Sequence, residues 1–354
     1  MLKAILAALA VVAALGCQAS ANRLSAMPAA PVSSEPIVWP SPPAPSRILY
    51  VGSISVPEDV GIKKSFFGRL ADAILNKAEQ RFVRPTGVAE RDGLLYVADP
   101  GAQALWIFDP ARRRSLKVDQ AGDRRLLSPV AVAPAPDGQV FLADSQLGKV
   151  LLFDSQGKLV RDISGADLER PAALAYEATD DRLYVADSKG QQVVVYSRQG
   201  SKLLSWGSAG TQDGEFNRPS YLALAGPNTV LVTDALNYRV QAFDKQGRFL
   251  WKMGHQGDGS GDFSSPKGVA IDREGHLYVV DALFDAVQIF DRDGTLLLSF
   301  GSHGPGPGEF SLPTGAFIDG RDRIYVADSY NQRVQVFEFL GDSQAPPSME
   351  SRAQ

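Results

Sequence analysis

The chain is poor in the residues that most cross-linking and metal chemistry requires. Of its 354 residues, only one is cysteine and three are histidine. A single cysteine, Cys17, excludes an intramolecular disulfide, so an exported domain of this chain must be held together by packing. The formal net charge is only −4, which provides no broad attraction to polyanions. We therefore expect no nucleic-acid partner.

The N-terminal apolar run is too short to span a bilayer. Residues 4–15 are apolar and follow a positive Lys3, whereas a membrane-spanning helix needs about 20 apolar residues. This pattern is typical of a signal peptide. The run ends in "AALGC", residues 13–17, which resembles the lipobox of bacterial lipoproteins. The resemblance implies a lipoprotein signal peptide over residues 1–16 and lipidation of Cys17, and an ordinary secretory signal is the alternative.

The resemblance to lipoproteins also implies a location. The protein is expected to be exported and held at a membrane by its lipid. Gln18 follows the cysteine, which favours the outer membrane, facing either the periplasm or the cell surface. Residues 17–46 are rich in Pro, Ala and Ser and predict an extended tether, and residues 341–354 predict a disordered tail.

The segment between tether and tail, residues 47–340, is a sixfold repeat. An acidic residue follows an apolar run in each unit, and a proline precedes each unit's first apolar run. The acids are Asp99, Asp144, Asp187, Asp234, Asp281 and Asp328, and the prolines are Pro85, Pro129, Pro171, Pro219, Pro266 and Pro313. The acids are separated by 45, 43, 47, 47 and 47 residues. A period of about 40 to 50 residues is typical of β-propellers.

Each unit divides into four short strands separated by Gly-containing turns, which suit tight hairpins. The strands are apolar on both faces, so stacked sheets are needed to bury them. We predict an all-β, six-bladed propeller of four-stranded antiparallel blades. The sixth unit lacks a fourth strand, and "RILYVGSI", residues 47–54, stands unpaired before the first unit. We predict that this N-terminal strand closes the ring, and that residues 63–80 form one helical insertion that covers the core or contacts a partner.

The repeated motifs resemble the NHL-repeat family of six-bladed β-propellers, in the form of a bacterial lipoprotein. The resemblance rests on "RPTGVA", "SPKGVAID" and "LPTGAFID", on "YVAD", and on "NYRVQAFD" and "NQRVQVFE". The first three units lack the "GEF" motif and the Asn-x-Arg motif of the later ones. The resemblance implies the fold but no single activity, because similar propellers include enzymes, receptors and RNA-binding proteins.

The six repeated acids are interpreted as structural. Six equivalent carboxylates do not form a site of unlike converging groups, and each can accept backbone hydrogen bonds from the following loop. No catalytic residue and no cofactor is predicted. The resemblance to amidating lyases and lactonases leaves a metal-dependent enzyme as the alternative function. His255 and His303 are weak metal candidates, since His276 is expected on the opposite face.

The loops after the second strands vary most between units, and variable loops on a rigid scaffold commonly bind partners. Aromatic and guanidinium groups in these loops predict a binding face. Its candidate residues are Tyr238, Arg239, Phe284, Tyr330 and Arg333. We therefore predict a monomeric, lipid-anchored, non-catalytic module of the cell envelope that binds a protein, a peptide or a glycan.

Overall fold

The computed structural model describes residues 35–63, 80–163, 165 and 168–341. Contacts divide the chain into two units, Met1–Glu35 and Pro36–Gln354, and the propeller belongs to the second. Cys17, the expected helix between residues 63 and 80 and the expected tail lie wholly or almost wholly outside the described residues.

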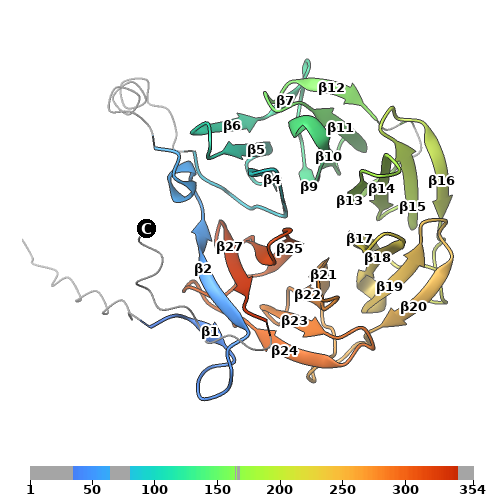
Figure 1. Ribbon diagram of the computed structural model, residues 1–354. Helices are drawn as coiled ribbons and strands as arrows, with labels where there is room; N and C mark the ends of the chain where they lie inside the picture. Colours follow the sequence, from blue (N-terminus) through green and yellow to red (C-terminus); the bar gives the residue numbers. More distant parts are fainter. Residues whose placement is uncertain (1–34, 64–79, 164, 166–167, 342–354) are drawn as a thin grey trace, which may run out of the picture. The chain divides into compact units, whose positions relative to one another are not determined.

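Six antiparallel sheets form the blades of a propeller, as predicted (Figure 1). Blade 1 contains β3 (Gly87–Arg91), β4 (Leu94–Asp99), β5 (Ala104–Asp109) and β6 (Arg114–Val118). Blade 2 contains β9 (Pro129–Pro134), β10 (Val140–Asp144), β11 (Lys149–Phe153) and β12 (Leu159–Asp162). Blade 3 contains β13 (Pro171–Glu177), β14 (Arg182–Asp187), β15 (Gln192–Ser197) and β16 (Lys202–Trp206).

The second half of the ring repeats this order. Blade 4 contains β17 (Pro219–Ala225), β18 (Thr229–Asp234), β19 (Arg239–Asp244) and β20 (Phe249–Met253). Blade 5 contains β21 (Pro266–Ile271), β22 (Leu277–Asp281), β23 (Ala286–Phe290) and β24 (Leu296–Phe300). Blade 6 contains β25 (Pro313–Ile318), β26 (Arg323–Asp328), β27 (Arg333–Phe339), β2 (Ile48–Ile54) and β1 (Val38–Trp39).

The remaining elements are short. A small hairpin, β7 (Gln120–Ala121) with β8 (Arg124–Arg125), lies between blades 1 and 2. Single 3-10 turns occur at Pro57–Val60, Pro136–Gly138 and Ala235–Asn237. The described residues therefore contain almost no helix.

Burial in each blade follows the apolar pattern of its strands. The middle strands are buried on both faces, as in β4 and β5, because neighbouring blades cover them. The outermost strands alternate between half-buried and exposed residues, as in β20. Phe216, Phe263 and Phe310 of the loops between blades are completely buried, and Phe310 packs in a cluster with side chains of blades 5 and 6.

The N-terminal strand β2 closes the ring, as the missing strand of the sixth unit predicted. β2 pairs antiparallel with β27, and the fully buried Ile48 lies opposite Phe339. Neighbouring inner strands contact each other all the way round, including β25 of blade 6 and β3 of blade 1. Two contacts therefore close the ring: the inner strands of blades 6 and 1 touch, and the N-terminal strand β2 completes the blade formed by the C-terminal strands.

The structured domain begins before Arg47, which corrects the predicted boundary with the tether. β1 adds a fifth strand to blade 6, with Val38 opposite Leu49. The ring of Trp39 packs at 5.7 Å from that of Phe300 and at 5.9 Å from that of Phe337. The apolar residues of "PIVWP" make this contact. The Pro-rich composition of residues 17–46 was therefore not sufficient to predict that the whole segment is an extended tether.

Candidate functional site

The two ends of the ring differ in what they expose. We call the end that carries the repeated acids and the connections between blades the loop face. The opposite end carries the two hairpin turns of each blade, and we call it the turn face. Candidate sites were predicted only on the loop face.

The six repeated acids are fully buried and receive hydrogen bonds from the connection that enters their own blade. Asp99 accepts from the backbone N–H groups of Val83 at 2.7 Å and Arg84 at 2.9 Å. Asp281 accepts equivalent bonds from Ser264 at 2.7 Å and Ser265 at 2.9 Å. These carboxylates hold the loop face in place and point away from its surface.

Arg239 and Arg333 are not part of an exposed binding face, contrary to the prediction. Arg239 is only 6% exposed and Arg333 only 9%. The guanidinium of Arg333 pairs with Asp328 at 2.8 Å and donates three further hydrogen bonds to backbone carbonyls of the connection between blades 5 and 6. Arg239 makes the same set of contacts one third of the ring away, starting with Asp234 at 2.9 Å. Every nitrogen of both guanidinium groups therefore has at least one internal acceptor.

The aromatic candidates differ among themselves. Tyr330 is 60% exposed, whereas Tyr238 and Phe284 are half-buried, Tyr238 against the core between blades 4 and 5. The structure adds Leu236, 48% exposed, and Leu283, 62% exposed. Both stand two residues after a repeated acid, as does Tyr330. The repeat alignment contained this signal, but aliphatic loop residues were not considered as candidates.

The three histidines do not converge. His255 contacts Asp262 at 2.6 Å, His303 contacts Asp285 at 2.8 Å, and His276 contacts Asp272 at 2.8 Å, so each has its own acidic partner. Within the described part of the chain, no group of three or more His, Cys, Asp or Glu side chains is placed to hold a metal ion.

A cavity of about 360 Å³ lies on the axis at the loop face. Six of its lining residues are equivalent, because each directly follows a repeated proline. They are Thr86, Val130, Ala172, Ser220, Lys267 and Thr314. The inner strands of all six blades therefore contribute to one concave site at the centre of the ring.

The loop-face cavity is cationic. Lys267, Arg218 and Arg170 line it, and none of the described residues that line it is acidic. Arg170 donates to Ser145 at 3.3 Å, while neither Arg218 nor Lys267 has a side-chain hydrogen bond or ion pair within the described residues. Burial lowers the pKa of Lys267, Asp281 opposes this effect and Arg218 adds to it. An anion in the cavity would relieve this concentration of positive charge.

The loop-face cavity was not predicted from the sequence. Lys267 is the only charged member of the six residues that follow the repeated prolines. Arg170 and Arg218 immediately precede the prolines of two other blades. Each residue is unremarkable in its own unit, and the charges meet only because the ring brings the inner strands together.

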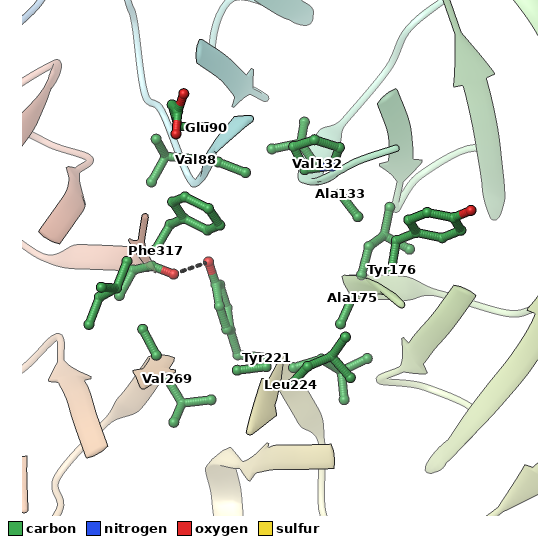
Figure 2. Close-up of a pocket in the computed structure, with 18 of the residues that line it drawn as sticks. Val88, Glu90, Val132, Ala133, Ala175, Tyr176, Tyr221, Leu224, Val269 and Phe317 are labelled. Carbon is green, nitrogen blue, oxygen red and sulfur yellow. Dashed lines mark hydrogen bonds between the residues drawn. The ribbon is translucent and has the colours of Figure 1, made fainter. Parts of the chain in front are cut away.

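A second cavity, of about 270 Å³, lies on the axis towards the turn face. Figure 2 shows its lining, with Val88, Val132, Ala175, Leu224, Val269 and Phe317 arranged around the centre. Its charged lining residues are Glu90, which accepts from the Gly93 backbone at 2.7 Å, and Arg91. The side chains that line this cavity are mostly apolar and include one acid, whereas the lining of the cationic cavity includes no acid among the described residues.

Tyr221 lines both cavities and separates them. Its hydroxyl donates to the Ala316 carbonyl at 3.0 Å, a contact from blade 4 to blade 6 that is drawn in Figure 2. The other five blades have Gly or Ala at this position: Gly87, Ala131, Ala173, Gly268 and Gly315. Small residues are required there because a Cβ at Gly268 would lie 2.5 Å from the Ala316 nitrogen. Among the six residues at this position, Tyr221 is the only large one.

Comparisons with known proteins support the fold. A family profile described as a 6-bladed beta-propeller matches residues 211–284 and 274–344. Two curated proteins show partial similarity: a gluconolactonase of Zymomonas mobilis, 32% identical over 111 residues, and Teneurin-m of Drosophila melanogaster, 32% identical over 75 residues. The matches span 27% and 21% of this chain but only 31% and 3% of those proteins.

Solved structures show the same architecture at low sequence identity. An auxiliary nutrient binding protein from Bacteroides thetaiotaomicron superposes with a TM-score of 0.59 at 12% identity, over 73% of this chain and 69% of that one. Virginiamycin B lyase from Staphylococcus aureus superposes with a TM-score of 0.55 at 12% identity, over 73% of this chain and 96% of that one. At these identities the similarity establishes the fold alone.

Within the described residues, no helix has both the length and the apolar character needed to cross a membrane.

Proposed function

We propose that this protein is a non-catalytic binding module of the cell envelope that accepts an anionic ligand in its loop-face cavity. The observation that carries the proposal is the grouping of Lys267, Arg218 and Arg170 around one cavity without an acidic lining residue. Ligand pockets combine a concave site with a few convergent polar groups, and this cavity has that form. Burying a lysine without a partner costs stability, which is expected at a site adapted to a ligand.

The proposed location follows from the N-terminal segment. A signal peptide over residues 1–16, lipidation of Cys17 and the Pro-, Ala- and Ser-rich segment that follows it would anchor a monomeric propeller at a membrane, most simply the outer membrane. An NHL-type repeat is compatible with this role. The fold itself is compatible with binding, since it is shared with a protein described as an auxiliary nutrient binding protein. Incorporation of radiolabelled palmitate, lost in Cys17→Ser, tests the anchor.

A metal-dependent propeller enzyme is the second candidate, and the partial similarity to a gluconolactonase favours it. The three histidines count against it, because each pairs with a different acid. Metal analysis of protein purified without chelators tests this candidate. Stoichiometric zinc or calcium that is lost on replacing His255 or His303 would establish it in place of the binding function.

Calorimetric titration with inorganic phosphate, citrate and a neutral hexose tests the binding function. We expect at least one anion to bind and the hexose not to bind. Lys267→Met should weaken anion binding by about 10- to 100-fold, since one hydrogen bond to a charged group contributes about 1.5–3 kcal/mol. Lys202→Met removes an exposed lysine from the outer strand β16 and is the matched control for net charge. Equal binding by both variants, or no binding of any anion, would contradict the proposal.

A further inference from the structure

Four exposed apolar side chains lie on the loop face of blades 4 to 6, and we call them the apolar row. They are Leu236 at 48% exposure, Leu283 at 62%, Leu312 at 36% and Tyr330 at 60%. Leu236, Leu283 and Tyr330 are equivalent in the repeat, and blades 1 to 3 have Gly101, Gln146 and Lys189 at that position. At this position the loop face is therefore apolar on blades 4 to 6, whereas blades 1 to 3 have glycine or a polar residue there.

Hydrogen bonds hold three members of the apolar row, Leu283, Leu312 and Tyr330, on neighbouring loops of blades 5 and 6. The backbone N–H of Leu312 donates to the Asp285 carboxylate at 2.7 Å, two residues from Leu283. The backbone N–H of Tyr330 donates to the Ser311 carbonyl at 3.2 Å, next to Leu312. The row thus continues across the boundary between blades 5 and 6 on loops of defined position.

The apolar row reaches the cationic cavity at Leu236. Leu236 lines the cavity itself, and its backbone N–H donates to the Asn217 carbonyl at 3.0 Å, beside Arg218. Arg218 and Leu312 precede the prolines of blades 4 and 6, and both adopt left-handed backbone conformations, with φ of 67° and 47°. Non-glycine residues in this conformation are strained, and such strain is concentrated at binding sites. Leu236 is therefore the member of the apolar row that borders the charged pocket.

We propose that the ligand is a polypeptide segment whose carboxylate enters the loop-face cavity and whose neighbouring apolar side chains pack on the apolar row. This proposal rests on the proposed binding of anions in the cavity. Lys267 and Arg218 supply the charge complementarity for the carboxylate. Aromatic and aliphatic anchors beside a charged contact are the usual composition of peptide-binding surfaces.

A lipid fits this area less well than a peptide. The apolar row consists of side chains on separate loops, each open to solvent, and an acyl chain lying across it would keep much of its surface in water. The second cavity is separate from the cationic one, and Tyr221 is the only lining residue that the two share. Separate side chains of a peptide can instead contact separate leucines.

The carboxylate has two sources, a chain terminus or an acidic side chain, and four labelled peptides distinguish them. The first is Gly-Ser-Leu-Tyr-Ala-Leu with an uncharged BODIPY dye on its N-terminus and a free C-terminus, and the second is its C-terminal amide. The third is an amide with Asp in place of Ala, and the fourth has a free C-terminus with Ser in place of Leu and Tyr. Fluorescence anisotropy with the full-length protein, together with calorimetry of acetate, measures all affinities.

We expect the first or the third peptide to bind at least 10-fold more tightly than acetate. The second peptide, which has no carboxylate, and the fourth, which lacks the apolar side chains, should not show this higher affinity. Leu283→Ser with Tyr330→Ser should remove the gain and leave acetate binding unchanged. Leu250→Ser is the control, because it also replaces an exposed apolar side chain, 48% exposed, but one that lies on the outer strand β20 and not on the loop face. Lys267→Met should weaken both acetate and peptides.

Three results would overturn the proposal. If acetate binds through Lys267 but no peptide gains affinity over it, the cavity binds anions and the polypeptide inference is wrong. If peptides bind equally to Lys267→Met, the carboxylate does not enter the cavity. If neither acetate nor any peptide binds, both the proposed function and this inference are wrong.

Discussion

The hydroxyl of Tyr221 in blade 4 donates a hydrogen bond to the carbonyl of Ala316 in blade 6 across the axis of the propeller. Burial raises the pKa of Tyr221 above its ordinary range, and the bond to Ala316 offsets this only in part, so the hydroxyl remains a donor at neutral pH. The contact joins two blades that are not neighbours and keeps a cationic and an apolar cavity apart.

Replacing Tyr221 should connect the two cavities and destabilise the ring. Tyr221→Phe should cost about 1 kcal/mol of unfolding free energy, because one hydrogen bond is lost. Tyr221→Ala should cost more, about 2–4 kcal/mol, since large-to-small changes also leave unfilled space. Urea denaturation measures both. Equal losses in the two variants would show that the ring of Tyr221 does not support the axis.

Lys267→Met should stabilise the unliganded protein while it weakens anion binding. The folded-state pKa of Lys267 is lowered, so the charged form is destabilised by folding, and the penalty is fully present below that pKa. It diminishes as pH rises from the lowered pKa to the ordinary value of 10.5. The increase in melting temperature should therefore be larger at pH 7 than above pH 10. A variant less stable than the parent at pH 7 would disprove the cost assigned to this lysine.

Strand β2 should be necessary for stability, because it closes the ring. Ile48→Ala removes a fully buried side chain from the cluster between blades 5 and 6 and should cost about 2–4 kcal/mol. Val51→Ala changes a residue of the same strand that is 40% exposed and should stay within about 0.5 kcal/mol of the parent. Similar effects from both changes, measured by thermal unfolding, would argue against a closing role for β2.

Arg333→Met should be strongly destabilising if this arginine is internal. The change leaves Asp328 buried without its cation and frees three carbonyl contacts, and breaking such a pair costs about 3–5 kcal/mol. Arg248→Met is the control, because the side chain of Arg248 is 81% exposed although it pairs with Asp244. If Arg333→Met were as stable as the parent protein but no longer bound its ligand, Arg333 would belong to the binding face, as the sequence predicted.

The fold could be predicted because its information is local and repeated. One strand-ending acid and one strand-opening proline per unit established the number of blades, and the unpaired segment 47–54 identified the closing strand. The site could not be predicted in the same way. Arg239 and Arg333 were predicted to be exposed because they lie in loops. Carbonyl groups of the connection between blades surround them, and the sequence does not reveal the path of that connection. Tyr221 was detectable, since it stands where five other units have Gly or Ala.

The position of β1 and β2 gives the propeller a mechanical property. Any pull on the chain before Pro36 reaches the ring through β1, whose pairing with β2 involves two residue pairs, and then through the longer pairing of β2 with β27. A weak pull would peel off β1 and expose Trp39 while the ring remains closed. A stronger one would act on the strand that closes the ring, so tension on the N-terminal segment would be converted into opening of blade 6.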